Sequence, residues 1–261
     1  QHVETFGNLQ NIIDTKFELI DFLPADGIAI LNLDDENIRS HLNKVTVPIV
    51  SYGMEQENLD YIAYDVQVTA KGSVFKVKNK AGQEQVFTTK LLGRHNIHNI
   101  LAAIAAAGVM GVSMEMAAKA VKTLEPVPHR LSWQRTPQNI VVIDDAFNSN
   151  PVGSQIALEV LAKIPGNKKI IVTPGMVELG EKEELLNKDF AQSAAVVCDY
   201  IILVGKKHSR PLQEGLEAVS FPQERLFVAQ NLEEANGKIR EITEPGDVIL
   251  FENDLPDTYN E

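Results

Sequence analysis

The feature that most constrains the fold is an alternation of short apolar runs with longer amphipathic segments through the second half of the chain. Each run is typical of a buried strand, and each longer segment has the apolar spacing of a helix. Strands that alternate with helices over such short connections require a parallel, doubly wound sheet. The strands are predicted at 139–143, 168–173, 200–204, 225–228 and 247–251, and the helices at 151–164, 183–197, 212–218 and 232–242.

Two carboxylates end the first of these predicted strands. Asp144 and Asp145 follow the apolar run, and the polar residues Asn148 and Ser149 come shortly after them. In an open parallel sheet the ligand lies beyond the carboxyl ends of the strands, so these side chains stand where a ligand would be held. Position alone leaves an equal alternative, in which one aspartate caps the turn and the other is a solvated loop charge.

The helix after this turn has a clear start. Asn150 is a good N-cap residue, and Pro151 has the fixed φ that suits the first helical position. An apolar stripe follows from Val152 on, which predicts that one helix face packs on the sheet and that Gly166 closes the element.

The first half of the chain also alternates between strands and helices, but its middle differs. Three short alternating segments between residues 61 and 91 predict an antiparallel meander at a sheet edge. Before them, a helix is expected at 8–22, strands at 27–33 and 45–51 and a short helix at 34–42, and after them alanine-rich helices at 96–107 and 113–124.

Pro126 and Pro128 make the segment between the two halves stiff. We place the domain boundary there and predict one domain over 1–125 and another over 126–261. The predicted fold class is α/β throughout.

Composition limits the partners. The formal net charge of -12 argues against non-specific binding to nucleic acid or to anionic membranes. No stretch approaches 18 consecutive apolar residues and Cys198 is the only cysteine, so we expect no membrane insertion, no internal disulfide and a cytoplasmic location. Because the first residue is Gln1 and not methionine, we expect the chain to be cut from a longer one or trimmed after synthesis.

Three further groups of residues are candidates for chemistry. His2 lies two residues before Glu4, and Lys16 follows in the first predicted helix. The simpler interpretation is a chance polar pair at a frayed terminus and a surface lysine on an amphipathic helix. Asn96 and Asn99, three apart in a first helical turn, share a face and can both donate to and accept from a purine edge, although an asparagine there is usually a cap. Arg130 in the stiff segment can bind a phosphate with two hydrogen bonds, or be a solvated charge.

The motifs around these residues resemble those of the Mur ligases, ATP-dependent amide ligases of cell-wall peptidoglycan synthesis. The similar stretches are His-Val-Glu-Thr-Phe-Gly at residue 2, Gly-Arg-His-Asn-Ile-His-Asn at 93, Pro-His-Arg at 128 and Asp-Asp-Ala-Phe-Asn-Ser-Asn-Pro at 144. The turn at 144 looks most like the branch of the family that adds a D-alanyl-D-alanine dipeptide. The resemblance covers nearly the whole chain.

The resemblance implies a role for each motif. His2 and a carbamoylated Lys16 would bind Mg²⁺, because carbamoylation converts the lysine into an oxygen donor of the kind that magnesium prefers. The paired amides Asn96 and Asn99, with His95 between Arg94 and Asn96, would contact the adenine of ATP.

The family pattern assigns the second half in the same way. Asp145 would bind the ribose and Arg130 a phosphate, while Asn148, Ser149, Asn150 and Glu178 would contact the amine-bearing substrate. The catalytic set implied by the resemblance is therefore Lys16, His2 and Arg130.

The resemblance also implies that this chain holds only part of the enzyme. Residues 1–125 would be the C-terminal half of a central ATPase domain, without its phosphate loop, and 126–261 a Rossmann-like C-terminal domain. The reaction would proceed through an acyl phosphate that an amino acid or dipeptide then attacks. Its substrates would be small molecules, one of them a nucleotide-linked muramoyl peptide, and the protein is expected to be a monomer.

Two departures from the family pattern leave alternatives open. Gly-Met-Val-Glu-Leu-Gly at 175 lacks the aspartate of the similar family loop, and Glu252-Asn253-Asp254 stands where the dipeptide-adding members carry Lys-Gly-Ser-Arg. The acceptor is therefore open, and a ligase that extends folate with glutamate or builds a polyamide is a rival. A nucleotide-binding module without catalysis is a second.

Overall fold

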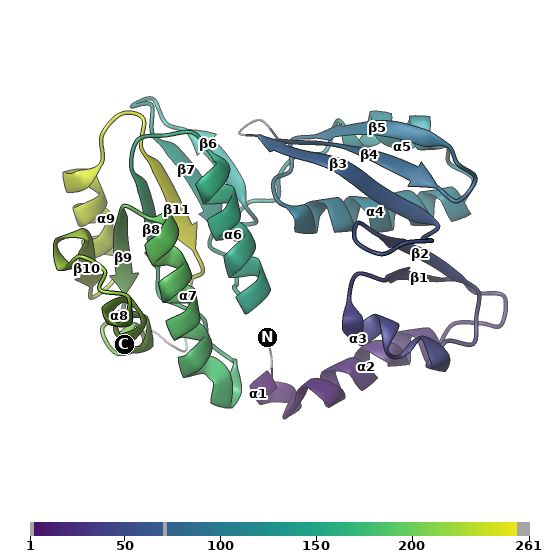
Figure 1. Cartoon of the computed structure of the whole chain (residues 1–261), viewed down its shortest axis with the longest axis horizontal. Coiled ribbons are helices and arrows are strands. Elements are labelled where there is room, and N and C mark those ends of the chain that lie inside the picture. Colours follow the sequence, from purple (N-terminus) through teal and green to yellow (C-terminus); the bar gives the residue numbers. More distant parts are fainter. Residues whose placement is uncertain (1–2, 70–71, 255–261) are drawn as a thin grey trace. The chain divides into compact units, whose positions relative to one another are not determined.

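The computed structural model describes residues 3–69 and 72–254. Contacts between residues divide the chain into two compact units, Phe6–Glu125 and the part from Pro126 onward. We call them the N-terminal and C-terminal units. Figure 1 labels their elements, which follow the short opening helix α1 (Val3–Phe6).

The N-terminal unit is built on a five-stranded sheet whose strands lie in chain order. The first three are parallel, and the last three form an antiparallel meander, which confirms the prediction from their alternating sequence. Short alternating strands joined by tight turns favour this pairing. The strands are β1 (Ala29–Asn32), β2 (Ile49–Gly53), β3 (Tyr61–Thr69), β4 (Gly72–Asn79) and β5 (Glu84–Thr89).

The helix α4 (Arg94–Val109) packs on this sheet through a fully buried apolar face that includes Ile97 and Leu101. These side chains meet Phe75 and Phe87 of the meander, so the meander and the helix share one core. Burial of side chains of this size removes roughly 1.5–3 kcal/mol each from the free energy of the folded state. The short helices α3 (Glu36–Arg39) and α5 (Met114–Val121) complete the unit's connections.

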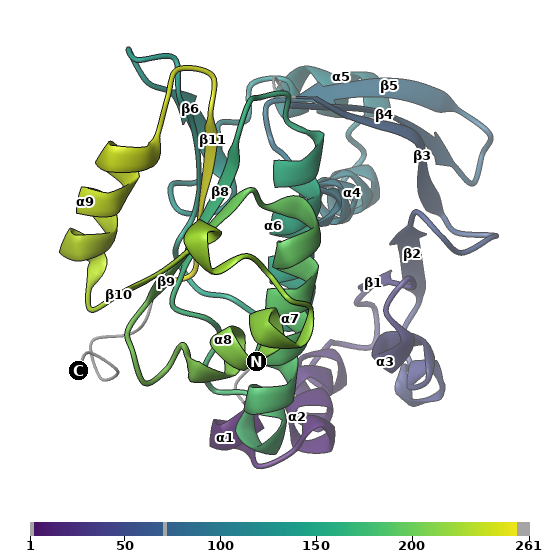
Figure 2. The same cartoon turned by 60° about the vertical axis from the view of Figure 1, so that its left-hand side comes forward.

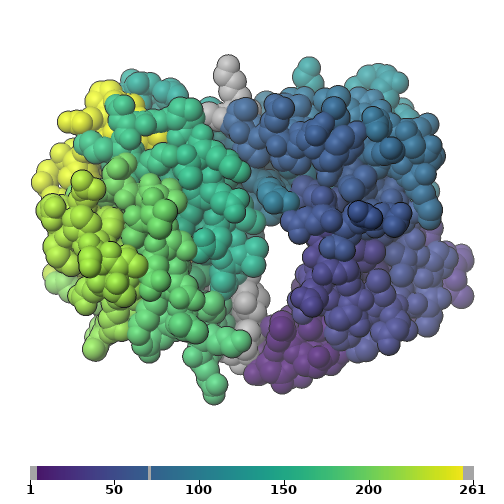
Figure 3. Space-filling model, in the orientation of Figure 1, coloured from purple at the N-terminus to yellow at the C-terminus, as the bar shows by residue number. Residues whose placement is uncertain are grey.

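The helix α2 (Leu9–Asp21) begins at Asn8, whose side chain caps the backbone N–H of Asn11. Its buried residues are Ile13 and Phe17. Ile12 and Ile20 are half-buried, and the other residues of the helix are exposed; its purple atoms are visible in Figure 3.

The C-terminal unit contains a six-stranded sheet in the order β10-β9-β8-β11-β7-β6. Every neighbouring pair is parallel except β6 with β7. The sheet is therefore mostly parallel, as the alternation of strands and helices predicts. The strands are β6 (Ser132–Arg135), β7 (Val141–Asp145), β8 (Lys169–Thr173), β9 (Tyr200–Val204), β10 (Leu226–Ala229) and β11 (Val248–Glu252).

Helices cover both faces of this sheet, with α9 on one side and α6 and α7 on the other (Figure 2). Along the sheet, the chain passes from β7 through β8 and β9 to β10 at one edge, and then returns to β11 between β8 and β7. Because parallel crossovers are right-handed, the outward and the return connections place their helices on opposite faces. This is the doubly wound arrangement. The helices are α6 (Pro151–Lys163), α7 (Glu183–Val197), α8 (Arg210–Ala218) and α9 (Leu232–Ile242).

The structure corrects the sequence prediction at the strand β7. The strand was expected to end before the two aspartates, but it includes them, because Asp144 and Asp145 pair with Phe251 and Glu252 of β11. The edge strand β6 was not predicted, since only its pairing with β7 identifies it. Its sequence, Ser-Trp-Gln-Arg, lacks the apolar run of a buried strand.

The helix α6 also differs in detail. Its N-cap is Asn150, as predicted, but it ends at Lys163 with Ile164 as C-cap rather than at Gly166. Val152, the predicted start of the apolar stripe, is 70% exposed, and Ser154 is fully buried in its place. The packed face is therefore rotated relative to the predicted one.

Candidate functional site

The residues predicted to hold a ligand in the C-terminal unit gather at the carboxyl ends of β7, β8 and β11, three neighbouring strands. Asp145 ends β7, Thr173 ends β8 and Glu252 ends β11. Because the strands are parallel, these three side-chain positions lie at one edge of the sheet, where open α/β sheets bind their ligands.

Asp145 is half-buried, and its Oδ1 accepts a 2.9 Å hydrogen bond from the backbone N–H of Leu131. Burial raises the pKa of the Asp145 carboxyl to about 6, against the opposing effects of that hydrogen bond and of Arg130, while Asp144 adds to the rise. Asp144 caps its own turn through the N–H of Ala146. Asp144 is therefore the aspartate that caps the turn. Asp145 has the raised pKa that is typical of functional carboxyls.

Arg130 lies against the same turn. Its guanidinium is 4.3 Å from the ring centroid of Phe147, whose backbone N–H donates to the carbonyl of His129. His129 also pairs with Asp144, with 2.9 Å between Nδ1 and Oδ2. Four contacts therefore join the segment 129–131 to the turn 144–147 and set the predicted phosphate and ribose residues, Arg130 and Asp145, next to each other.

Glu252 is the residue of this edge that sequence reasoning misplaced. The sequence places it among the acids that follow the last predicted strand, but Glu252 belongs to β11 and its side chain is buried. It accepts hydrogen bonds from the hydroxyls of Ser149 and Thr173. Burial raises the pKa of the Glu252 carboxyl to about 7, beyond what the two hydroxyls offset, and the nearby Asp145 contributes to the rise.

Ser149 therefore has a structural partner, since its buried hydroxyl donates to Glu252. Asn150 likewise uses its Oδ1 to cap the N–H groups of Val152 and Gly153. Asn148, between them and Phe147, is exposed. Of the three predicted substrate residues in this turn, the structure leaves Asn148 with the most accessible side chain.

The loop after β8 is held by residues that the sequence did not single out. Asn187 of α7 is buried, accepts from the N–H of Met176 and donates to the carbonyls of Met176 and Glu183. Asn253 donates to the carbonyl of Gly175, and its Oδ1 is buried with no hydrogen-bond partner among the described residues. Glu178, predicted to contact substrate, lies in this loop, half-buried and with φ +62°.

In the N-terminal unit, Asn96, Asn99 and His95 begin α4 as predicted. The Nδ2 of Asn96 donates to the carbonyl of Leu92 at 2.7 Å, so its Oδ1 and one amide hydrogen remain for a ligand. Asn99 is exposed and His95 is half-buried. The two amides are one turn apart on the same face of the helix.

Lys16 is exposed on α2. His2, its predicted partner in binding magnesium, lies outside the described residues. Among residues 3–69 and 72–254, no group of three or more His, Cys, Asp or Glu side chains is placed to hold a metal ion. Within the same ranges no helix has the length and apolar character needed to span a membrane.

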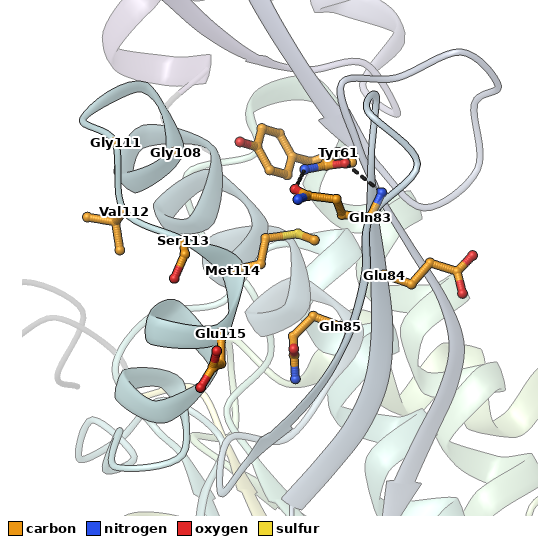
Figure 4. A pocket seen from close by; sticks show the side chains of 11 residues that line it. Tyr61, Gln83, Glu84, Gln85, Gly108, Gly111, Val112, Ser113, Met114 and Glu115 are labelled. Atoms are coloured by element: carbon orange, nitrogen blue, oxygen red, sulfur yellow. Dashed lines mark hydrogen bonds between the residues drawn. The ribbon is translucent and has the colours of Figure 1, made fainter.

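A pocket of about 460 Å³ in the N-terminal unit lies between the meander and the start of α5 (Figure 4). Tyr61 and Gln85 line it from the strands, Gln83 from the turn between β4 and β5, and Ser113 and Glu115 from the start of α5. No predicted site residue lines this pocket, so it is separate from the nucleotide motif at the start of α4.

Comparison with known proteins gives two family matches. The sequence profile of the Mur ligase middle domain matches residues 1–107, and that of the Mur ligase glutamate ligase domain matches residues 129–252.

Individual relatives point the same way. A UDP-N-acetylmuramoyl-tripeptide–D-alanyl-D-alanine ligase of Bacillus subtilis (strain 168) is 29% identical over 96% of this chain and 53% of its own length. The ligase of that name from Escherichia coli (strain K12) is 31% identical over 79% of this chain and 46% of its own length. The chain spans about half the length of these relatives.

Solved structures share the fold. MurF ligase from Thermotoga maritima, in complex with ADP, matches with a TM-score of 0.80 at 21% identity, covering 97% of this chain and 56% of that one. MurF from Acinetobacter baumannii matches with a TM-score of 0.82 at 23% identity, covering 99% and 55%. The two profile matches, which together extend over most of the chain, show that it belongs to the Mur ligase family of ATP-dependent ligases.

Proposed function

We propose that this chain is the part of an ATP-dependent amide ligase of peptidoglycan precursor synthesis that binds the adenosine of ATP and the amine-bearing acceptor. The observation that carries the proposal is the set of contacts between segment 129–131 and turn 144–147. It places Arg130 beside Asp145, so a cationic group for a phosphate and a carboxylate for a ribose hydroxyl are neighbours.

The adenine is assigned to the N-terminal unit. Asn96 and Asn99 offer amide donors and acceptors to the purine edge, and His95 lies beside them at the start of α4. The ionised carboxylate of Asp145 accepts a hydrogen bond from a ribose hydroxyl, and Arg130 contacts a phosphate.

The acceptor is assigned to the carboxyl edge of the C-terminal sheet. Asn148 and Glu178 are the proposed direct contacts, from the turn after β7 and the loop after β8. Ser149 and Asn150 support that turn from within, through the bond to Glu252 and the cap of α6. Buried supports of this kind hold the contacting residues in a fixed geometry, which ligand orientation requires.

Magnesium is the proposed metal, with His2 and a carbamoylated Lys16 as ligands. Lys16 suits the modification because its side chain is exposed and carries no ion pair among the described residues. A bound magnesium ion would offset negative charge during phosphoryl transfer. The role of Lys16 in this site is then to supply a carbamate oxygen, which unmodified lysine cannot do.

The proposed acyl donor is a nucleotide-linked muramoyl peptide, and the acceptor is an amino acid or dipeptide. Glu252 and Asp254, in place of the cationic pattern of the dipeptide-adding members, leave the acceptor's identity to experiment. The protein is proposed to act as a monomer in the cytoplasm.

The test is ATP-dependent amide formation by the longest natural chain that contains these 261 residues, given a panel of acceptors. The panel includes D-alanyl-D-alanine, single amino acids, and glutamate with a folate donor. The proposal predicts ADP release that depends on a muramoyl peptide donor and one acceptor. Turnover with the folate donor alone, or none with any pair, would overturn it.

A further inference from the structure

The carboxylate of Asp34 joins three segments of the N-terminal unit. Its Oδ2 accepts from the N–H of Met54 at 2.6 Å, and its Oδ1 accepts from the N–H groups of Glu55 and Gln56 at 3.0 and 3.2 Å. Nε2 of His98 donates to Oδ2 at 2.8 Å. Asp34 follows β1, residues 54–56 follow β2, and His98 belongs to α4, so one carboxylate links two strand ends to the helix that carries the purine motif.

The site is built closely around this carboxylate. The Asp34 side chain is only 7% exposed. Burial raises the pKa of Asp34, but the hydrogen bonds from His98, Met54 and Glu55 outweigh it and hold that pKa below its ordinary value. Gly53 completes the fit, because a Cβ there would stand 2.5 Å from Asp34 Oδ1. The Asp34 carboxylate holds its four donors in place, because a buried charge that loses a hydrogen-bond donor costs free energy.

The side chain of His98 lies on the side of α4 away from Asn96 and Asn99. Successive residues of a helix are about 100° apart, so Asn96 and Asn99 lie about 60° apart while His98 lies about 160° from Asn96. Arg94, four residues before His98, is on nearly the same side. It pairs with Glu55, with 2.9 Å between Nη2 and Oε1.

The first two turns of α4 are therefore attached to the loop after β2 at two points on one side. His98 reaches that loop through Asp34, and Arg94 reaches it through Glu55. Rotation of the helix about its axis would break both contacts. Because Asn96 and Asn99 are part of the same turns, these attachments fix their direction together with the buried side chains of Ile97 and Leu101.

We propose that His98 is a positioning residue for purine recognition, which sets the direction of Asn96 and Asn99 through its bond to Asp34. The proposal rests on the proposed function, in that it takes these amides to contact adenine. The resemblance assigns no role to His98, and it is the contact with Asp34, 64 residues away, that gives the histidine this one. Its effect is on the choice of purine, and not only on the stability of the unit.

The experiment compares the binding of ADP and GDP to the 261-residue chain and three variants by isothermal titration calorimetry. His98→Leu keeps bulk and removes the donor, whereas His98→Gln retains an Nε2 donor at similar reach. Lys80→Leu is the matched control, because it removes the cationic partner of Asp60, another carboxylate of this unit that accepts a backbone N–H. Thermal unfolding followed by circular dichroism confirms that each variant is folded at the temperature of the titration.

We expect the wild type and Lys80→Leu to prefer ADP over GDP. His98→Leu should bind ADP about tenfold more weakly and lose most of that preference, and His98→Gln should restore both to within about twofold. A folded His98→Leu variant with unchanged ADP affinity and preference would overturn the positioning role while leaving the purine site intact. A wild type that does not distinguish ADP from GDP would overturn the purine site itself, and the positioning role with it.

Discussion

The guanidinium of Arg130 lies 4.3 Å from the ring centroid of Phe147, within a turn that also carries Asp145. A cation–π contact at a partly exposed site contributes about 0.5–1 kcal/mol. Phe147 therefore holds the Arg130 guanidinium in place before a nucleotide binds. Less side-chain entropy is then lost when Arg130 contacts the phosphate.

Replacing Phe147 by leucine should weaken ADP binding about two- to fivefold, because Arg130 loses its support. Adenosine, which has no phosphate, should bind as tightly as to the wild type. Calorimetric titrations with both ligands measure this difference. Val152→Ala, which truncates an exposed apolar residue just after the same turn, is the control and should change neither affinity. Equal weakening of ADP and adenosine by Phe147→Leu would show that Arg130 is not held for a phosphate.

The raised pKa of Asp145 makes a second prediction, on pH. Burial keeps the Asp145 carboxyl neutral up to about pH 6. The ionised carboxylate is a stronger acceptor for a ribose hydroxyl than the neutral acid. Adenosine affinity should therefore rise as pH increases through about 6, as measured by NMR titration. Asp145→Asn should bind more weakly and show no such rise. A pH-dependent rise that persists in Asp145→Asn would assign the titration to another group.

Glu252 should affect the stability of the C-terminal unit in a pH-dependent way. Its pKa is about 7 in the folded chain against an ordinary value of 4.5, so the folded state retains a proton that the unfolded state loses between these values. The free energy of unfolding should accordingly fall as pH rises from about 4.5 to 7, by on the order of 3 kcal/mol for this group.

Urea unfolding of wild type and Glu252→Gln measures this effect directly, because glutamine stays neutral at every pH. The variant should match the wild type near pH 4 and be more stable near pH 8. Asp145 titrates in both proteins, so the difference between them reports Glu252 together with its coupling to Asp145. A constant difference at all pH values would mean that Glu252 has the same pKa in the folded and unfolded states, which would contradict the raised pKa.

Asn187 should be needed to hold the loop that carries Glu178. Its side chain makes three hydrogen bonds to backbone groups at 2.9 to 3.0 Å, and two of them reach the buried N–H and carbonyl of Met176. Asn187→Leu has a similar volume but leaves those groups unsatisfied, so unfolding in urea should show a loss of about 2–4 kcal/mol. Gln155→Leu, which removes an exposed hydrogen bond to Ser193, is the control and should cost little. A loss no larger than that of the control would contradict the assignment.

The sequence predicts best those elements whose signals are local. The strand Tyr200–Val204 and the helix Leu232–Ile242 have their predicted bounds, because a β-branched run and a capped 3.6-residue period each identify an element without reference to the rest of the chain. The N-cap Asn150 followed by Pro151 is confirmed for the same reason.

The sequence does not predict features that depend on distant partners. The edge strand β6 is defined by its pairing with β7, and the burial of Glu252 by hydroxyls far away in the sequence. A charged residue after an apolar strand is usually solvated, so only the structure identifies Glu252 as an internal support. The link between Asp34 and His98 is likewise visible only once β1 and α4 are placed together.

The candidate site was predicted in part. The motifs single out Asn96, Asn99, Arg130 and Asp145 as candidates, and the structure places the last two beside each other in the C-terminal unit. It could not be foreseen that Ser149 and Asn150 have structural partners, because an exposed turn is the default expectation for polar residues after a strand.

The most direct test of the account is a crystal structure of the chain grown with ADP and magnesium. The account predicts adenine hydrogen-bonded to Asn96 and Asn99, a ribose hydroxyl on Asp145 and a phosphate on Arg130. Adenine bound elsewhere, for example in the pocket lined by Tyr61 and Glu115, with Asn96 and Asn99 free of it, would contradict the account.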